Sequence, residues 1–174
     1  GEAGDDTLYG EAGNDSMIGY AGNDLLVGAD GLDYLADNTS GDDTFAGGAG
    51  NDTLLANYGN DTVQFDVGGG YDKVTLYYAA VGEGAVLELG AGLLPGDVTL
   101  HHTNGSRDLI LRFNASDQVG IQTWFDGATR QFSEIRFDDG TVWTWAANLA
   151  EKSAHTQGTA ANDYMDVTAT HDIV

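Results

Sequence analysis

The sequence predicts an all-β protein in which a parallel β-roll of nonapeptide repeats is followed by a small antiparallel β capping region. A nine-residue pattern rich in glycine and aspartate fills the first 75 residues, and an apolar residue keeps the same place in every copy. Longer alternating strands with tight-turn signals follow. We therefore expect a roll over 1–75, a β-rich capping domain over 76–152 and a tail over 153–174.

The repeats begin at Gly1, and the segments 1–9, 10–18 and 19–27 align without gaps. Later copies contain Gly-x-Asp triplets that begin at Gly31, Gly41, Gly50, Gly59 and Gly70, with one extra residue before Gly41 and two before Gly70. An apolar residue stands two places after the aspartate of each copy: Leu8, Met17, Leu26, Leu35, Phe45, Leu54, Val63 and Val74. This register predicts three-residue strands, with the middle side chain pointing inward, joined by six-residue turns. Such strands are too short to be stable alone, so the coils must stack.

The turns carry the chemistry of a calcium site. Glycine permits positive φ angles and brings carbonyl oxygens together, and the aspartate adds a carboxylate. Ca²⁺ takes six to eight such oxygens. Because turns alternate between the edges of the roll, the aspartates are expected to form two columns: Asp6, Asp24, Asp43 and Asp61 on one edge, and Asp15, Asp33, Asp52 and Asp72 on the other. Each neighbouring pair on an edge is expected to hold one ion, which predicts up to six ions in the roll.

The charge of the chain supports bound cations. There are 28 acidic and 6 basic residues, a formal net charge of −22, and residues 1–74 hold 15 of the acids and one base, Lys73. A compact polyanion repels itself unless cations neutralise it, and it is a poor partner for nucleic acid. A competing interpretation is that the triplets are ordinary turns with solvated aspartates. That interpretation does not explain the apolar residue that keeps its register through eight copies.

These copies resemble the repeats-in-toxin (RTX) haemolysin-type nonapeptide, Gly-Gly-x-Gly-x-Asp-x-apolar-x, a known calcium-binding signature, over residues 1 to about 75. The resemblance implies that the sixth-position aspartates ligate calcium together with main-chain carbonyls. It implies that those carbonyls come from the first four turn positions and include the fourth-position glycines: Gly4, Gly13, Gly22, Gly31, Gly41, Gly50 and Gly59. Glu2, Glu11 and Tyr20 depart from the pattern at the second position, where glycine is usual.

The second half alternates as longer strands. We expect strands at about 85–89, 97–103, 107–113, 117–124, 132–138 and 141–145, and a short helix over 145–152. Asn104-Gly105 and Asp139-Gly140 are tight-turn signals.

Several motifs in this half occur in order: Leu87-Glu-Leu-Gly-Ala-Gly-Leu-Leu-Pro-Gly-Asp-Val-Thr-Leu, Asp108-Leu-Ile-Leu-Arg-Phe, Trp124-Phe-Asp and Ile135-Arg-Phe-Asp-Asp-Gly-Thr-Val-Trp. They resemble the haemolysin-type calcium-binding-protein-related domain, which commonly follows such repeats in secreted bacterial proteins. The resemblance implies a β-rich flank that covers the open end of the roll. The aromatic residues Trp124, Phe125, Trp143 and Trp145 form either the core of this sheet or a sugar-stacking face. His101 and His102 are adjacent on an expected strand and point to opposite faces, so they do not suit a joint metal site.

The chain ends with 158–165, which looks like a degenerate repeat, and with His171-Asp-Ile-Val, which resembles the export signal of some type I secreted proteins. A cut inside a second repeat block explains this end equally well. Because Gly1 lies within an ongoing repeat, we expect a fragment of a longer chain.

The functional prediction is a secreted, monomeric calcium-binding module of a larger bacterial toxin, adhesin or exoenzyme, with the type I secretion apparatus as its partner during export. The alternative is a carbohydrate-binding or accessory module of a secreted enzyme. No catalytic role is expected of these residues, since they contain neither His-Glu-x-x-His nor Gly-x-Ser-x-Gly. The sequence contains no run of about 18 apolar residues, so it predicts no transmembrane segment.

Overall fold

The computed structural model describes residues 1–77, 84–102, 105–126, 130–144 and 164–165. In these ranges the chain forms fifteen β-strands and two short 3-10 segments, and none of the residues described is in an α-helix. The all-β prediction is confirmed. Within the same ranges, no helix is long and apolar enough to cross a membrane. The expected helix over 145–152 lies outside the described residues.

The repeats supply the first eight strands, one from each copy. They are β1 (Thr7–Tyr9), β2 (Ser16–Ile18), β3 (Leu25–Gly31), β4 (Tyr34–Ala36), β5 (Thr44–Gly50), β6 (Thr53–Asn57), β7 (Thr62–Phe65) and β8 (Tyr71–Tyr77). The strands β3 and β5 are longer than the expected three residues. They continue into the next turn, where Ala29 pairs with Gly48 and Gly31 with Gly50.

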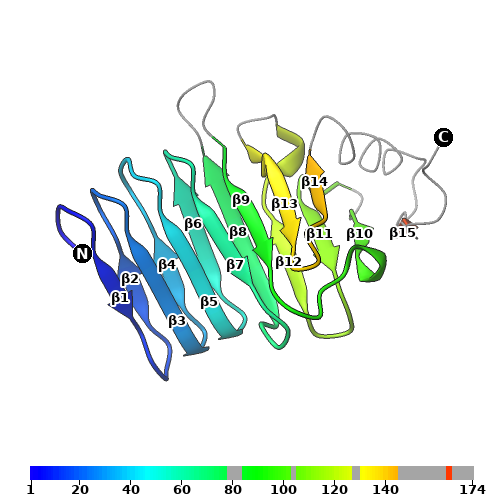
Figure 1. Cartoon of the computed structure of the whole chain (residues 1–174), viewed down its shortest axis with the longest axis horizontal. Coiled ribbons are helices and arrows are strands. Elements are labelled where there is room, and N and C mark those ends of the chain that lie inside the picture. Colours follow the sequence, from blue (N-terminus) through cyan, green and yellow to red (C-terminus); the bar gives the residue numbers. More distant parts are fainter. Residues whose placement is uncertain (78–83, 103–104, 127–129, 145–163, 166–174) are drawn as a thin grey trace.

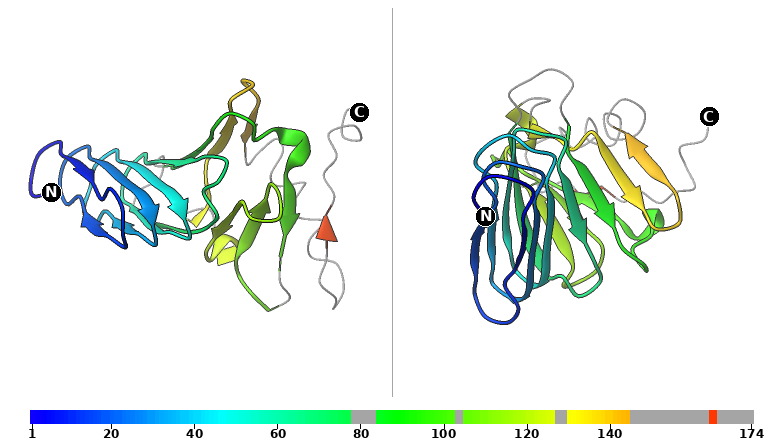
Figure 2. Two further views of the ribbon diagram at one scale, coloured as in Figure 1. Left: turned by 90° about the horizontal axis from the view of Figure 1, so that it is seen from below. Right: turned by 60° about the vertical axis from the view of Figure 1, so that its left-hand side comes forward.

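Successive strands alternate between two sheets, which gives the predicted flattened coil. The odd strands pair in parallel in the order β1-β3-β5-β7, and the even strands pair in parallel in the order β2-β4-β6-β8. Figure 1 shows the coils stacked along the molecule from the N-terminus, and the left view of Figure 2 shows the two layers with the turns at their edges. The turns on one edge of the roll therefore come from every second copy, and consecutive turns of that edge are neighbours in space.

The apolar residue of each copy lies between the sheets and stacks on its counterpart one coil away. In one sheet Leu8 pairs with Leu26, and the column continues through Phe45 and Val63. In the other sheet Met17 pairs with Leu35, followed by Leu54 and Val74. All of these side chains are buried except Leu8, which is partly buried against the same core. The predicted inward register is confirmed.

The remaining strands follow the repeats at the expected places. They are β9 (Val86–Leu89), β10 (Thr99–His101), β11 (Leu109–Arg112), β12 (Gln118–Ile121), β13 (Glu134–Phe137), β14 (Val142–Thr144) and β15 (Tyr164–Met165), with 3-10 segments η1 (Pro95–Asp97) and η2 (Trp124–Asp126). The turn at Asp139-Gly140 is also present, since Gly140 has φ 86° and its N–H donates to the Phe137 carbonyl.

These later strands extend the two sheets of the roll. In the first sheet β9 pairs in parallel with β7, and β13 pairs in parallel with β9. In the second sheet β12 pairs in parallel with β8. Antiparallel pairing begins only beyond them, where β14 pairs with β13, β11 with β12, and β10 with β11. The capping strands thus grow directly on the last coil of the roll.

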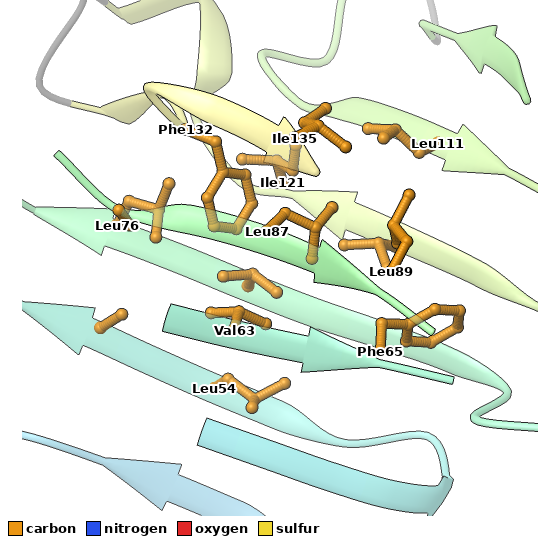
Figure 3. Close-up of a cluster of buried hydrophobic side chains, with 14 of the residues drawn as sticks. Leu54, Val63, Phe65, Leu76, Leu87, Leu89, Leu111, Ile121, Phe132 and Ile135 are labelled. Atoms are coloured by element: carbon orange, nitrogen blue, oxygen red, sulfur yellow. The ribbon is translucent and has the colours of Figure 1, made fainter. Parts of the chain in front are cut away.

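The apolar columns continue through this junction. Val63 pairs with Leu87, which pairs with Ile135, and Val74 pairs with Ile121. Figure 3 shows the side chains of Val63, Leu87, Ile121 and Ile135 in one cluster with those of Phe65 and Phe132. A single core cluster runs from Met17 to Trp143. Repeats and flank therefore share one core among the residues described.

Three of the four aromatic residues singled out in the flank belong to that core, and the fourth, Trp145, lies outside the described residues. Trp124 is 0% exposed and Trp143 is 6% exposed, and Phe125 packs against the same cluster. A sugar-stacking face needs exposed rings, so these two tryptophans do not provide one. His101 contacts the Thr99 hydroxyl, whereas His102 contacts the Ser106 carbonyl, so the two imidazoles serve different neighbours.

Asp117 ties the flank to the last turn before β8. Its buried carboxylate accepts hydrogen bonds from Gly68 N (3.1 Å), Gly70 N (3.3 Å) and the Asn114 amide (2.7 Å). Burial acts to raise the pKa of Asp117, but the hydrogen bonds from Asn114, Gly68 and Gly70 outweigh it and hold the pKa below its usual value. The carboxylate is therefore a fixed charged brace between β12 and the repeats.

Replacing this brace is expected to weaken the protein as a whole. Asp117→Ala removes three hydrogen bonds to a charged acceptor, which should lower the free energy of unfolding by about 2 kcal/mol. Urea unfolding in saturating CaCl₂ measures this change, with Asp138→Ala at an exposed position as the control. Equal unfolding midpoints for the two variants would show that Asp117 is not a brace.

Candidate metal centre

The repeat aspartates form two columns, one along each edge of the roll. In each column the backbone N–H of one aspartate donates to Oδ1 of the aspartate one coil further on. On one edge these bonds join Asp6 to Asp24 (2.8 Å), Asp24 to Asp43 (2.7 Å) and Asp43 to Asp61 (3.0 Å). On the other edge they join Asp15 to Asp33 (2.8 Å), Asp33 to Asp52 (2.8 Å) and Asp52 to Asp72 (2.9 Å). The predicted stacking is confirmed.

The extra residues before Gly41 and Gly70 do not interrupt the columns. Asp43 and Asp72, which follow these insertions, accept hydrogen bonds as short as those between evenly spaced copies. The additional residues are accommodated in the turns, outside the strand register. A nine-residue spacing is therefore not required for an aspartate to reach its place in the column.

The second oxygen of these carboxylates has no protein partner. The Oδ2 atoms concerned are buried and accept no hydrogen bond: those of Asp15, Asp24, Asp33, Asp43, Asp52 and Asp61. The side chains of the last five are at most 2% exposed. Burying a charged oxygen without a partner costs several kcal/mol, so each of these atoms requires a cation or a proton.

The first glycine of each turn lies beside this unpaired oxygen. A methyl group added to Gly28 would come within 3.0 Å of both Asp33 Oδ2 and the Gly47 carbonyl oxygen. At Gly10 the same methyl would be 2.8 Å from Asp15 Oδ2 and 2.8 Å from the Gly28 carbonyl oxygen. A carboxylate oxygen of one turn and a first-position carbonyl of the next turn thus face the same small space.

The family resemblance implies carbonyls from the first four positions of each turn, and the residues named for them are the fourth-position glycines; the first-position carbonyls are the ones that lie beside the aspartate oxygens. The structure directs the fourth-position carbonyls along the column toward the fourth glycine one coil away. Examples are the Gly13 carbonyl against Gly31 and the Gly31 carbonyl against Gly50. The glycines at Gly1, Gly10, Gly19, Gly28 and Gly47 were the available signal, because a side chain there would collide with the aspartate of its own turn.

The fourth-position glycines have a steric role in addition. Gly22, Gly31 and Gly50 hold φ values of 135°, 152° and 149°, and each receives the carbonyl of the coil before it too closely for a Cβ. At the second position Glu11 and Tyr20 hold φ values of 70° and 71°. A residue other than glycine costs about 1 kcal/mol in this left-handed region. The departures from glycine therefore carry a strain cost in the folded roll.

The fifth-position residues build a second ladder that the sequence analysis missed. Asn23 N donates to Asp5 Oδ1 (2.8 Å), Asp42 N donates to Asn23 Oδ1 (2.9 Å), and Asn60 N donates to Asp42 Oδ1 (2.9 Å). This ladder runs in the opposite sense to the aspartate columns, because here the earlier turn supplies the side chain. It explains why Asn or Asp so often precedes the sixth-position aspartate.

The donor set fits calcium. Across the described ranges, no three Asp, Glu, His or Cys side chains gather closely enough to hold a metal alone. An ion at the aspartate columns therefore needs main-chain carbonyls as well, and all of the available ligand atoms are oxygens. Hard Ca²⁺ prefers such mixed carboxylate and carbonyl shells. With calcium bound, the Oδ2 atoms would have the partner that the protein does not provide.

Burial and mutual repulsion also change the protonation of the column aspartates. Burial, and after it the charge of neighbouring aspartates, raises the pKa of Asp43, Asp61 and Asp72 to about 7. The pKa of Asp52 is also raised by burial and by Asp33. Without metal, several of these carboxyls are therefore partly protonated near neutral pH, and protons compete with cations for the columns.

A first prediction concerns the space beside the aspartates. Gly28→Ala should exclude an ion from the Asp33 site, because the methyl would occupy the space that Asp33 Oδ2 and the Gly47 carbonyl face. Overpacking of this kind costs about 1–3 kcal/mol, so we expect a loss of affinity of about fivefold to 150-fold at one site. Isothermal titration with CaCl₂ measures it. Gly96→Ala is the control, since a Cβ there meets nothing within 4 Å; identical titrations of both variants would contradict the assignment.

A second prediction concerns pH in the absence of calcium. A carboxyl whose pKa is higher in the folded chain than its unfolded value of 3.8 binds protons more tightly when folded. Stability of the metal-free roll should then rise as pH falls from 8 to 5, by about 1.4 kcal/mol per group for each pH unit below its folded pKa of about 7. Far-UV circular dichroism in EDTA should show β structure increasing over this range. Loss of β structure on acidification would contradict the prediction.

Two family models match the chain. The RTX calcium-binding nonapeptide repeat matches residues 1–35 and 37–73, and the haemolysin-type calcium binding protein related domain matches residues 108–147. No curated protein matches the chain. Among solved structures, a subunit of the mannuronan C5-epimerase from Azotobacter vinelandii is 21% identical and covers 100% of this chain and 92% of its own, at a TM-score of 0.30. A TM-score this low carries no weight for the fold.

The repeat match includes every aspartate of the two columns and every glycine carbonyl named from the sequence. The second match begins at the loop before β11 and contains β12, β13 and β14. Residues 1–73 thus form a calcium-binding module of RTX haemolysin-type nonapeptide repeats, and residues 108–147, after these repeats, match the haemolysin-type calcium binding protein related domain.

Proposed function

We propose that this chain is a calcium-triggered folding module of a larger secreted bacterial protein. The observation that carries the proposal is the set of buried, unpartnered Oδ2 atoms in the two aspartate columns. In residues 1–74, 15 acids are accompanied by one base, so the protein itself cannot neutralise them. The roll then folds when an external cation supplies the missing charge.

The sites are the eight column aspartates with main-chain carbonyls of the turns. Three neighbouring pairs on each edge give room for up to six ions. Calcium binding energy becomes folding energy, because the turns that hold the ions exist only when the coils are stacked. Strands of three residues, such as β1, β2 and β4, have no independent stability.

Export explains why such a switch is useful. In a calcium-poor cytosol the acidic repeats stay unfolded and can pass through a channel of the type I kind. Outside the cell, sites of the extracellular type fill at about 10⁻⁴–10⁻³ M calcium and the roll folds. The flank at residues 76–152 then caps the last coil, where β12 and β13 add to the sheets. The chain acts as a monomeric support for its parent protein and has no catalytic role of its own.

The proposal predicts a calcium-specific folding transition. Far-UV circular dichroism during a CaCl₂ titration should show a cooperative gain of β structure with a midpoint at about 10⁻⁴–10⁻³ M, reversed by EDTA. MgCl₂ at the same concentration should not replace calcium, because Mg²⁺ demands a smaller octahedral shell and retains its waters. A spectrum that is already folded in EDTA at pH 8 and ignores calcium would refute the switch.

A further inference from the structure

Asp37 is an acidic residue that the nonapeptide pattern does not explain. It directly follows β4 and opens the turn that carries the extra residue before Gly41. Gly1 and Gly19 hold the corresponding first position in the earlier turns of this edge. A carboxylate therefore stands where these turns have only a hydrogen atom.

The main chain holds Asp37 firmly in the roll. Its N–H donates to the Leu55 carbonyl (3.0 Å), and its own carbonyl accepts from the Asn57 amide (2.8 Å). One carboxylate oxygen, Oδ2, accepts from Thr39 N (2.9 Å) and so closes a local turn around the extra residue. This turn accounts for only one of the two side-chain oxygens.

The other oxygen, Oδ1, is buried and has no hydrogen-bond partner, and Asp37 as a whole is 0% exposed. The ion pairs found among the described residues are those of Arg107 and Arg136, and neither includes Asp37. An anionic oxygen in this setting needs a cation for the same reason as the column aspartates do.

The position of Asp37 indicates which aspartate would share that cation. In the turns that begin at Gly1 and Gly19, a Cβ at the first position points at Oδ2 of the aspartate that ends the same turn. For the turn of Asp37 that aspartate is Asp43, whose Oδ2 is also buried and unpartnered. Among neighbouring carboxylates, the charge of Asp37 acts on Asp43 more strongly than those of Asp24 and Asp42.

We propose that Asp37 is an additional side-chain ligand, which shares one calcium ion with Asp43 on this edge of the roll. The inference rests on the proposed function, because it assumes that calcium fills the columns. Asp61, the next member of the column, also feels the charge of Asp37. The site between these turns would thus have more negative charge than any site of two aspartates and carbonyls, and it would hold calcium most tightly, since affinity follows the number of charged ligands.

Asp37→Asn separates the ligand role of Asp37 from its hydrogen bond in the local turn. The amide oxygen of asparagine can still accept from Thr39 N, whereas the charge for the ion is lost. Asp37→Gly is the second variant, because glycine holds the first position in the two earlier turns of this edge, at Gly1 and Gly19. Asp30→Asn is the matched control, since Asp30 is an exposed acid in a neighbouring turn.

The measurement is a calcium titration of the full 174-residue chain in competition with a chromophoric chelator, which resolves the tightest site. We expect both Asp37 variants to weaken that site about tenfold or more, whereas Asp30→Asn matches the unmodified chain. Circular dichroism in saturating calcium verifies that each variant folds.

Two outcomes overturn different claims. Unchanged affinity at every site in Asp37→Asn and Asp37→Gly would refute the ligand role of Asp37 and leave the folding switch intact. Failure of the unmodified chain to bind calcium at all would refute the proposed function itself. Loss of the tightest site in Asp30→Asn to the same extent would show a general charge effect, and would equally overturn the specific role of Asp37.

Discussion

Buried carboxylates stacked one above another are the feature on which the rest of this structure depends. From the second member of each column onward, an aspartate uses Oδ1 to accept the backbone N–H of its counterpart one coil back, and so couples neighbouring turns directly. The same geometry buries Oδ2 without a protein donor. A hydrogen bond that holds the coils together therefore brings with it an electrostatic cost that only a cation or a proton removes.

The apolar columns stabilise the roll but do not remove the electrostatic cost of the buried Oδ2 atoms. Leu26, Phe45 and Val63 pair in line in one sheet and bury fully, yet each strand contributes only one or two inward side chains. Burial of such residues is worth about 1.5–3 kcal/mol each, whereas ordering the backbone costs about 1–2 kcal/mol for every residue of the strand and turn. The apolar columns alone are therefore a weak source of stability, and neutralising the charges at the edges of the roll has a large effect on folding.

The flank solves a separate problem, the open end of the stack. A roll that stopped at β8 would leave β7 and β8 with unpaired edges and the last apolar residues in water. The strands β9, β12 and β13 continue the parallel pairing for one more coil, and antiparallel strands then finish both sheets. Asp117 adds a charged brace at the junction. Folding of the flank and folding of the repeats are therefore coupled through one core.

The sequence alone determined the repeat, its inward apolar register, the two aspartate columns and a turn chemistry suited to calcium, because these follow from local spacing and from the residues of the Gly-x-Asp turns. It also located the strands of the flank, since alternation is a local property. Only the tertiary structure decided that β9, β12 and β13 lengthen the parallel sheets, because that pairing joins residues far apart in the chain, such as Tyr71 and Gln118. It likewise decided which oxygens face one another. The first-position carbonyls and Asp37 come beside the aspartates through the stacking of coils, which no single nonapeptide contains.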